Sequence, residues 1–173
     1  MKQLPEIELN AGFREALGIM EETSRSIFVT GRAGTGKSTL LKYFRDITDK
    51  KVAVIAPTGV AALIVLGQTI HSFCRFKPNI TPERVKRLRY TATRKNIYEK
   101  LDAIVIDEIS MVRADLLDCV DKFLRLNGPH IDQPFGGIQM IFIGDLYQLP
   151  PVVTTKEKAI FVGHYSSPYF FSA

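Results

Sequence analysis

The sequence contains Gly31-Arg-Ala-Gly-Thr-Gly-Lys37-Ser38, which satisfies the G-x-x-x-x-G-K-[ST] pattern of a phosphate-binding loop. The apolar residues 26–30 before it favour a buried strand, and residues 37–47 after it have helical periodicity. Between a strand and a helix, such a loop turns backbone N–H groups toward phosphate oxygens, and the helix adds its positive end. We therefore expect a nucleoside triphosphate here; a glycine-rich turn without a ligand is the alternative.

Each residue type in this loop has a predicted task. Glycine lets the backbone curl tightly, Lys37 is expected to reach the β- and γ-phosphates, and the Ser38 hydroxyl is expected to bind Mg²⁺. The residues predicted to contact the nucleotide are Gly31, Ala33, Gly34, Thr35, Gly36, Lys37, Ser38 and Thr39.

The pattern of strand and helix continues along the chain. Consecutive apolar residues fill 51–56, 103–106 and 139–143, as expected for strands that are covered on both faces. Because such strands alternate with helices, we predict an α/β fold with a parallel sheet, helices on both faces and chemistry at the carboxyl ends of the strands. The further helical patterns are 9–22, 58–66 and 114–126.

Two acidic residues follow the predicted strand 103–106. A carboxylate at the tip of a buried strand is costly unless it faces a cation, so Asp107 is expected to hold Mg²⁺ indirectly, for example through a water. Glu108 beside it could act as the general base that polarises an attacking water, which indicates hydrolysis. The alternative is a pair of surface acids that open the next helix.

The strand 139–143 is followed by Gly144-Asp-Leu-Tyr-Gln148-Leu-Pro-Pro151. Asp145 and Gln148 are the polar groups at the mouth of the sheet, and the neutral amide of Gln148 could hydrogen-bond the γ-phosphate or the attacking water. Gln148 is therefore predicted to sense the γ-phosphate. Simple turn chemistry is the alternative.

Composition sets wider limits. The chain has 173 residues, 23 Lys+Arg and 18 Asp+Glu, for a formal net charge of +5. Much of the excess lies in 81–100, predicted to form one or two short basic helices that face either solvent or nucleic acid. The two cysteines, Cys74 and Cys119, lack metal-ligand spacing and are predicted to be reduced core thiols. No apolar run is long enough to span a membrane and no targeting signal is visible, so we expect a cytoplasmic protein.

The chain end has its own pattern. Ser167 followed by Pro168 is typical of a helix start, and the apolar residues after it are expected to have nothing to pack against. We therefore predict one domain over 1–173, in which 1–24 form an N-terminal helix and 154–173 begin a truncated continuation.

Together these motifs resemble the superfamily-one DNA helicases, and within them the RecD-like and Pif-type group. The resemblance runs from about Ser26 to Val153. The segments 107–111, Asp-Glu-Ile-Ser-Met, and 144–151 are its most diagnostic parts, and it also includes 31–38, Ala56-Pro-Thr-Gly-Val-Ala-Ala62, Gln68-Thr-Ile-His-Ser-Phe73 and Phe135-Gly-Gly-Ile-Gln139.

The resemblance implies a P-loop NTPase of the RecA-like kind that binds ATP with Mg²⁺, and in which the strand before Gln148 lies between the other two motif-bearing strands. It implies that Lys37, Asp107, Glu108 and Gln148 are catalytic and that Ser38 and Asp107 hold the metal. It also implies a single-stranded DNA contact, with Phe73 as a stacking face; packing near a turn is the alternative for His71 and Phe73. The residues of that contact are Pro57, Thr58, Gly59, His71, Ser72 and Phe73.

Two departures from the family pattern stand out. The family's adenine-reading Gln is absent, and Phe13 or Arg14 falls in its place; Arg14 could contact a base, or be a plain surface arginine. Nothing after Val153 resembles the second RecA-like domain. The resemblance implies that domain as a partner within the same full-length chain, and we expect that chain to be a monomer. Without its arginines, worth about three to five orders of magnitude in turnover, this piece is expected to hydrolyse ATP poorly.

We therefore expect the motor domain of an ATP-dependent DNA helicase that moves 5′ to 3′ on single-stranded DNA, with the family's links to DNA repair, recombination and telomere maintenance. The alternative is a DNA-binding module that nucleotide regulates without turnover. A GTPase-type switch is disfavoured, because the chain has no Asn-Lys-x-Asp motif for reading guanine.

Overall fold

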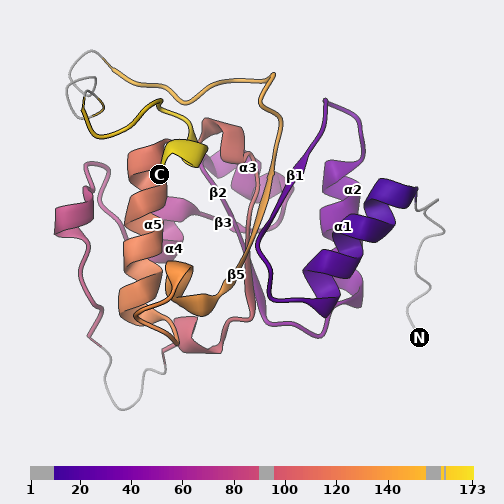
Figure 1. Ribbon diagram of the computed structural model, residues 1–173, viewed down its shortest axis with the longest axis horizontal. Coiled ribbons are helices and arrows are strands. Elements are labelled where there is room, and N and C mark those ends of the chain that lie inside the picture. Colours follow the sequence, from indigo (N-terminus) through magenta and orange to yellow (C-terminus); the bar gives the residue numbers. More distant parts are fainter. Residues whose placement is uncertain (1–9, 90–95, 155–160, 162) are drawn as a thin grey trace.

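The structure, a computed structural model, describes residues 10–89, 96–154, 161 and 163–173. Its centre is one five-stranded sheet of order β1-β5-β4-β2-β3, in which every neighbouring pair is parallel (Figure 1). The predicted α/β class and the predicted place of the Gln148-bearing strand, between the strands of the phosphate loop and of Asp107, are both confirmed. The strands are β1 Ile27–Thr30, β2 Val52–Ala56, β3 Gln68–Thr69, β4 Ala103–Ile106 and β5 Gln139–Gly144.

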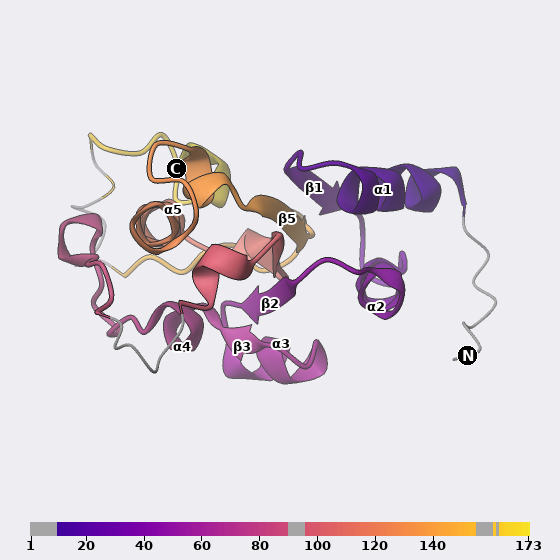
Figure 2. The ribbon, with the colours of Figure 1, turned by 90° about the horizontal axis from the view of Figure 1, so that it is seen from below.

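Helices cover both faces of the sheet, as predicted. Figure 2 shows α1 and α2 on one side of the strands and α4 and α5 on the other, with α3 below β2 and β3. The helices are α1 Ala11–Glu22, α2 Lys37–Ile47, α3 Gly59–Ile64, α4 Ile70–Cys74 and α5 Ala114–Asn127, and short 3₁₀ helices occupy Pro82–Arg84, Tyr98–Lys100, Ile109–Met111, Pro134–Gly137 and Phe170–Ser172.

The complete burial of strand β4 explains why the predicted strands consist of consecutive apolar residues. All four of its side chains are fully buried, and successive ones point to opposite faces. Ile104 and Ile106 join the core under α4 and α5, whereas Ala103 and Val105 join the core under α1 and α2. The sheet therefore separates two hydrophobic cores, and it holds its carboxyl edge rigidly in place.

The sequence predictions differ from the structure mainly in short elements. Strand β3 and helix α4 were not predicted, because two and five residues give too little periodicity to detect. In 81–100 the helices are shorter than expected: two 3₁₀ turns, Pro82–Arg84 and Tyr98–Lys100, are the helical parts among its described residues. Residue 9 of the predicted helix 9–22 and residues 90–95 of the basic segment 81–100 lie outside the described residues.

The chain end also differs from the prediction. The helical turn begins after Tyr169, not after Ser167, because the carbonyl oxygen of Pro168 accepts a hydrogen bond from the N–H of Ala114 instead of opening the turn. The expectation that this turn has nothing to pack against is wrong: the ring of Phe170 is buried and lies 5.2 Å from that of Phe28 in β1. In the described part of the chain, no helix has the length and apolar character that crossing a membrane requires.

Helix α3 ends in a strained turn that offers a stability test. Leu66 adopts φ 51°, its N–H donates to Leu63 O and the N–H of Gly67 donates to Ala62 O, the pattern of a Schellman cap that favours glycine. The left-handed conformation costs a non-glycine residue about 1–2 kcal/mol, and the Leu66 side chain is 81% exposed, so it contributes little packing. We expect Leu66→Gly to stabilise the chain by about 0.5–1 kcal/mol in urea denaturation, after the entropic cost of glycine.

Leu63 is the matched control, because it is 76% exposed and lies inside α3, where its backbone is helical and unstrained. Leu63→Gly should destabilise the chain by about 1 kcal/mol. Changes of the same sign in the two variants would contradict the assignment of strain to Leu66.

Candidate nucleotide site and DNA-facing edge

The predicted phosphate loop joins the end of β1 to the start of α2. Gly34 and Gly36 have φ angles of 78° and 88°, a left-handed backbone that side chains with a Cβ rarely adopt. The Thr35 hydroxyl donates to Arg32 O at 2.8 Å, which closes the loop on itself. The loop and the first turn of α2 therefore have the backbone shape on which the phosphate prediction depends. This geometry brings together Gly31, Ala33, Gly34, Thr35, Gly36, Lys37, Ser38 and Thr39.

Lys37 lies over this loop. Its Nζ donates to Gly31 O at 2.5 Å and to Arg32 O at 3.0 Å, so the ammonium is held by the carbonyls of the loop it follows. The positive charge of Lys37 contributes to the lowered pKa of Asp145, and it partly opposes the rise in the pKa of Asp107 that burial causes. One cation therefore acts on acidic residues from two other strands, as a group that neutralises phosphate charge must.

Asp107 and Glu108 follow β4 at the same edge. Burial raises the pKa of Asp107, and the neighbouring charge of Glu108 raises it further, so the ionised carboxylate lacks full compensation. Glu108 has φ 52°, a conformation that costs a non-glycine residue about 1–2 kcal/mol. Strain at a residue beside a poorly compensated carboxylate is typical of a functional site.

The end of β5 lies closely against the turn that follows these acids. A Cβ at Gly144 would lie 2.9 Å from Ile109 Cγ2 and 3.1 Å from Ser110 N, so only glycine permits this approach. Beyond it, Asp145 is buried and accepts from Gln148 Nε2 at 3.0 Å. Because β5 lies between β1 and β4, Gln148 belongs to the same edge as Lys37 and Glu108.

Asp145 and Ser110 had no site role in the sequence analysis. The Asp145 side chain accepts from Tyr147 N at 3.0 Å, which is the bond of an Asx turn. The available sequence signal for this turn was the D-x-x-Q spacing. Ser110 is fully buried, and its Oγ has no hydrogen-bond partner among the described residues. No sequence signal distinguishes such a serine.

The residues predicted to face DNA lie at the other end of the carboxyl edge. Ala56 of β2 is paired with Thr69 of β3, which brings 57–59 beside 70–73. Thr58 caps α3 by accepting from Ala61 N at 3.2 Å. Thr58, Gly59 and Ser72 are exposed, and Pro57 and His71 are half-buried. Burial lowers the pKa of His71, which favours its neutral form.

Phe73 does not fit the stacking role predicted for it. It is 6% exposed, its ring meets that of Tyr98 edge-on at 5.2 Å, and its carbonyl accepts from the Tyr98 hydroxyl at 2.6 Å. On helix α4, the Phe73 side chain joins the core that lies under α4 and α5, because so short a helix needs its apolar positions for packing. The packing alternative therefore holds for Phe73.

Helix α1 reaches the phosphate loop through Phe13. A Cβ at Gly36 would lie 3.1 Å from Phe13 Cζ, which places that ring on the loop. Arg14, the alternative candidate at the position of the family's adenine-reading Gln, is exposed on α1. Of these two residues, the structure brings Phe13 into contact with the loop.

Some basic side chains of the segment 81–100 make hydrogen bonds to backbone carbonyls within the chain. Arg87 Nε donates to Leu126 O at 2.8 Å, and Arg84 Nη1 donates to Asn79 O at 3.3 Å. Lys86, Arg89 and Lys100 are exposed. Both alternatives, a solvated face and a nucleic-acid surface, therefore stay open for these three residues.

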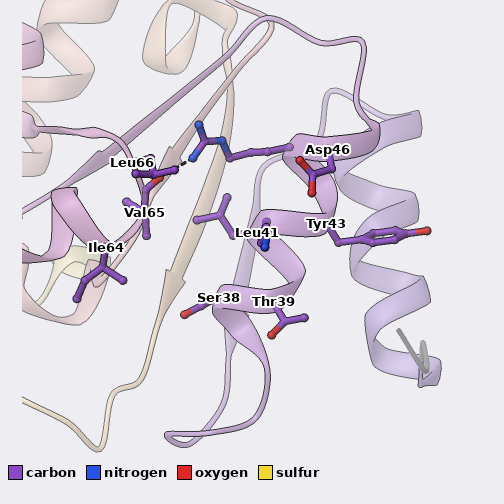
Figure 3. A pocket seen from close by; sticks show the side chains of 10 residues that line it. Ser38, Thr39, Leu41, Tyr43, Asp46, Ile64, Val65 and Leu66 are labelled. Carbon is purple, nitrogen blue, oxygen red and sulfur yellow. Dashed lines mark hydrogen bonds between the residues drawn. The ribbon is translucent and has the colours of Figure 1, made fainter. Parts of the chain in front are cut away.

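A pocket of about 630 Å³ lies beside the first turn of α2. Figure 3 shows Ser38 and Thr39 on α2, with Ile64, Val65 and Leu66 across from them. The Arg45 guanidinium spans the gap by donating to Val65 O. The lining includes no residue of 31–37, so this pocket meets the predicted nucleotide site only at Ser38 and Thr39.

A phosphate loop, an acidic pair and a glutamine at the ends of three adjacent parallel strands define a RecA-like P-loop NTPase domain. Within that class, the chain belongs to the PIF1-like helicase family, which it matches over residues 9–168.

Known proteins of this family are similar to the chain in sequence and fold. It is 43% identical over 147 residues to the ATP-dependent DNA helicase PIF1 of Saccharomyces cerevisiae, covering 80% of this chain and 17% of the relative. It is 33% identical over 159 residues to the ATP-dependent DNA helicase Pif1 of Bdellovibrio bacteriovorus, covering 88% of this chain and 35% of the relative. The Bacteroides Pif1 structure in complex with ADP-AlF3 and ssDNA is 38% identical with a TM-score of 0.87, covering 97% of this chain and 39% of that one. The chain therefore spans well under half of these relatives.

Proposed function

We propose that this chain is the first, ATP-binding motor domain of an ATP-dependent DNA helicase, which couples hydrolysis to 5′-to-3′ movement on single-stranded DNA. The observation that carries the proposal is the strand order β1-β5-β4, which gathers Lys37, Gln148 and the pair Asp107-Glu108 at one edge. Because the relatives are named as ATP-dependent DNA helicases and one is solved with ADP-AlF3 and ssDNA, ATP is the nucleotide and single-stranded DNA the track that we assign.

Mg²⁺ fits the proposed site. The Asp107 carboxylate is partly buried and its pKa is raised by that burial, so a cation would compensate its charge. No group of three or more His, Cys, Asp or Glu side chains that could hold a metal occurs in the part of the chain that the structure describes. That sparse donor set suits an ion that keeps several waters and phosphate oxygens as ligands. Ser38 and Asp107 would hold it, and when bound it would neutralise charge on the phosphates.

The chain's own residues have separate tasks in the proposed reaction. Lys37 leaves its loop carbonyls to bind β- and γ-phosphate oxygens, and the N–H groups of the loop bind the remaining oxygens. Glu108 accepts a proton from the attacking water as general base. Gln148 binds the γ-phosphate or that water and is released after hydrolysis, so that the site can report its nucleotide state.

DNA is proposed to bind at the far end of the same edge, on Pro57, Thr58, Gly59, His71 and Ser72. A rigid sheet joins this end to the nucleotide site, which supports mechanical coupling between the two. We further propose that a second RecA-like domain of the full-length protein completes both sites, that the protein works inside the cell, and that it acts as a monomer. One similar solved structure concerns DNA unwinding at forked dsDNA by two coordinating Pif1 helicases. That pairing is a statement about the protein in that structure.

The DNA assignment is tested by adding a negative charge at an exposed serine. Ser72→Asp should weaken binding of a fluorescently labelled oligothymidylate about fivefold in anisotropy titrations, because one charge near a phosphate contributes about 1 kcal/mol. Ser24→Asp, an exposed serine just before β1 at the opposite edge, is the matched control and should leave affinity nearly unchanged. Equal losses in both variants would indicate non-specific charge effects and contradict the assignment.

A further inference from the structure

Asp145 is placed unusually for a loop residue. It is 3% exposed, whereas the residues that follow it are exposed, Tyr147 at 91%. A buried carboxylate is costly unless hydrogen bonds and opposite charges compensate it. A surface turn would not require this burial, so the contacts of Asp145 indicate what it does.

Both carboxylate oxygens of Asp145 are used. Oδ1 accepts from Tyr147 N at 3.0 Å and fixes the turn, whereas Oδ2 accepts from the side-chain Nε2 of Gln148 at 3.0 Å. The backbone N–H of Gln148 also donates to Asp145 O at 3.0 Å. The Gln148 carboxamide, exposed and otherwise free to rotate, is thereby tied to a buried group.

Asp145 also faces the phosphate loop. The N–H of Tyr147 is the main cause of the lowered pKa of Asp145, and the amide of Gln148, the charge of Lys37 and the N–H of Ala33 add to it. Ala33 and Lys37 lie in the loop and at its end, and Thr30 of β1 is paired with Gly144. Asp145 therefore connects the predicted γ-phosphate sensor to the loop that binds the phosphates.

We propose that Asp145 is a positioning residue that holds the Gln148 carboxamide toward the phosphate loop and so sets how strongly the site distinguishes a nucleoside triphosphate from a diphosphate. The amide of Gln148 has two N–H donors and one carbonyl acceptor. With one N–H held by Asp145, the other N–H and the carbonyl face a γ-phosphate or its attacking water in a fixed orientation. This inference rests on the nucleotide-binding function proposed above.

Asp145→Asn separates the positioning role from the turn. The asparagine oxygen still accepts from Tyr147 N–H, but its NH₂ then opposes the NH₂ of Gln148. The Gln148 amide therefore either loses this bond or flips to offer its oxygen, and a flip reverses the groups that it presents to the nucleotide. In fluorescence titrations of the 173-residue chain with Mg²⁺, we expect ADP affinity within about threefold of wild type. The preference for adenylyl-imidodiphosphate over ADP should fall about fivefold to tenfold, the effect of one hydrogen bond.

Two further variants exclude a general structural effect. If Asp145 acts through Gln148, the double variant Asp145→Asn/Gln148→Ala should lose no more preference than Gln148→Ala alone. Asp102→Asn is the matched control, since Asp102 accepts from Lys51 N at 2.8 Å at the amino edge of the sheet, and it should leave the preference unchanged. Preference retained in Asp145→Asn, additive losses in the double variant, or an equal loss in Asp102→Asn would overturn the proposal.

The wild-type chain provides a test if Asp145→Asn does not fold. The side-chain NH₂ resonances of Gln148, identified by their loss in Gln148→Ala, should lie apart from those of solvent-exposed glutamines, and coincidence with them would overturn the proposal. Failure of the underlying function has a different signature, namely a wild-type chain without Mg²⁺-dependent nucleotide affinity.

Discussion

Lys37→Ala is expected to weaken binding of Mg·ATP about 10- to 100-fold. Lys37 Nζ is held over the phosphate loop by Gly31 O and Arg32 O, so its ammonium lies beside the loop whose N–H groups are expected to bind phosphate oxygens. A hydrogen bond to a charged group contributes about 1.5–3 kcal/mol, which corresponds to this change in affinity. Equilibrium titration with a fluorescent ATP analogue measures the effect.

The fold should survive this substitution, because Lys37 is partly exposed and bonds only to loop carbonyls among the contacts described. Lys42→Ala is the matched control: Lys42 is exposed on the same helix and should bind ATP as wild type does. Unchanged affinity in Lys37→Ala would remove the basis for the phosphate site.

Glu108→Gln is expected to leave nucleotide binding within about twofold of wild type and to reduce hydrolysis about 100- to 10,000-fold. The amide keeps the size of the side chain but cannot take a proton from water, and general-base catalysis contributes a factor of this order. The left-handed backbone at residue 108 is the same for Glu and Gln, so the fold should not change. Phosphate release under single-turnover conditions, at high protein concentration, measures the loss.

The control for this variant is Glu99→Gln, in the 3₁₀ helix Tyr98–Lys100 at the amino side of β4. Glu99 is exposed, and its neutralisation should not change turnover. Hydrolysis by Glu108→Gln at the wild-type rate would assign the general base elsewhere.

Much of the fold could be predicted because its core strands are unusually apolar. The predicted bounds of β4 agree with the structure, and those of β1, β2 and β5 differ by one residue at one end, since strands buried on both faces carry a continuous signal. Helix α2 was likewise predicted correctly, because the loop pattern fixes its start and its apolar stripe fixes its length.

The sequence could not reveal contacts that depend on tertiary packing. Phe73 is aromatic beside a predicted DNA-facing turn, and only the rings packed around it show that it belongs to the core. Phe13 lies in the predicted helix 9–22, and only the structure shows that its ring, which packs against the core, also lies on Gly36 of the loop. The burial of Asp145 and Ser110 depends on the close approach of Gly144 to the turn after Glu108, which no local pattern encodes.

The residue types at the sheet edge were easier to predict than their geometry. Lys37, Asp107, Glu108 and Gln148 were selected because their chemistry suits phosphate, metal and water. Their assembly follows from the placement of β5 between β1 and β4, which the family resemblance implied and the structure confirms. Their individual roles remain proposals, for which the variants above provide tests.

The central claim is that this edge of the sheet is a Mg²⁺-dependent nucleotide site. Calorimetric titration of adenylyl-imidodiphosphate into the 173-residue chain, with Mg²⁺ and then with EDTA, tests it most directly. We predict saturable binding at a single site with Mg²⁺ and a loss of most of that affinity with EDTA, because Ser38 and Asp107 would hold the ion against the phosphates. Absence of saturable binding, or identical binding with and without Mg²⁺, would contradict the claim.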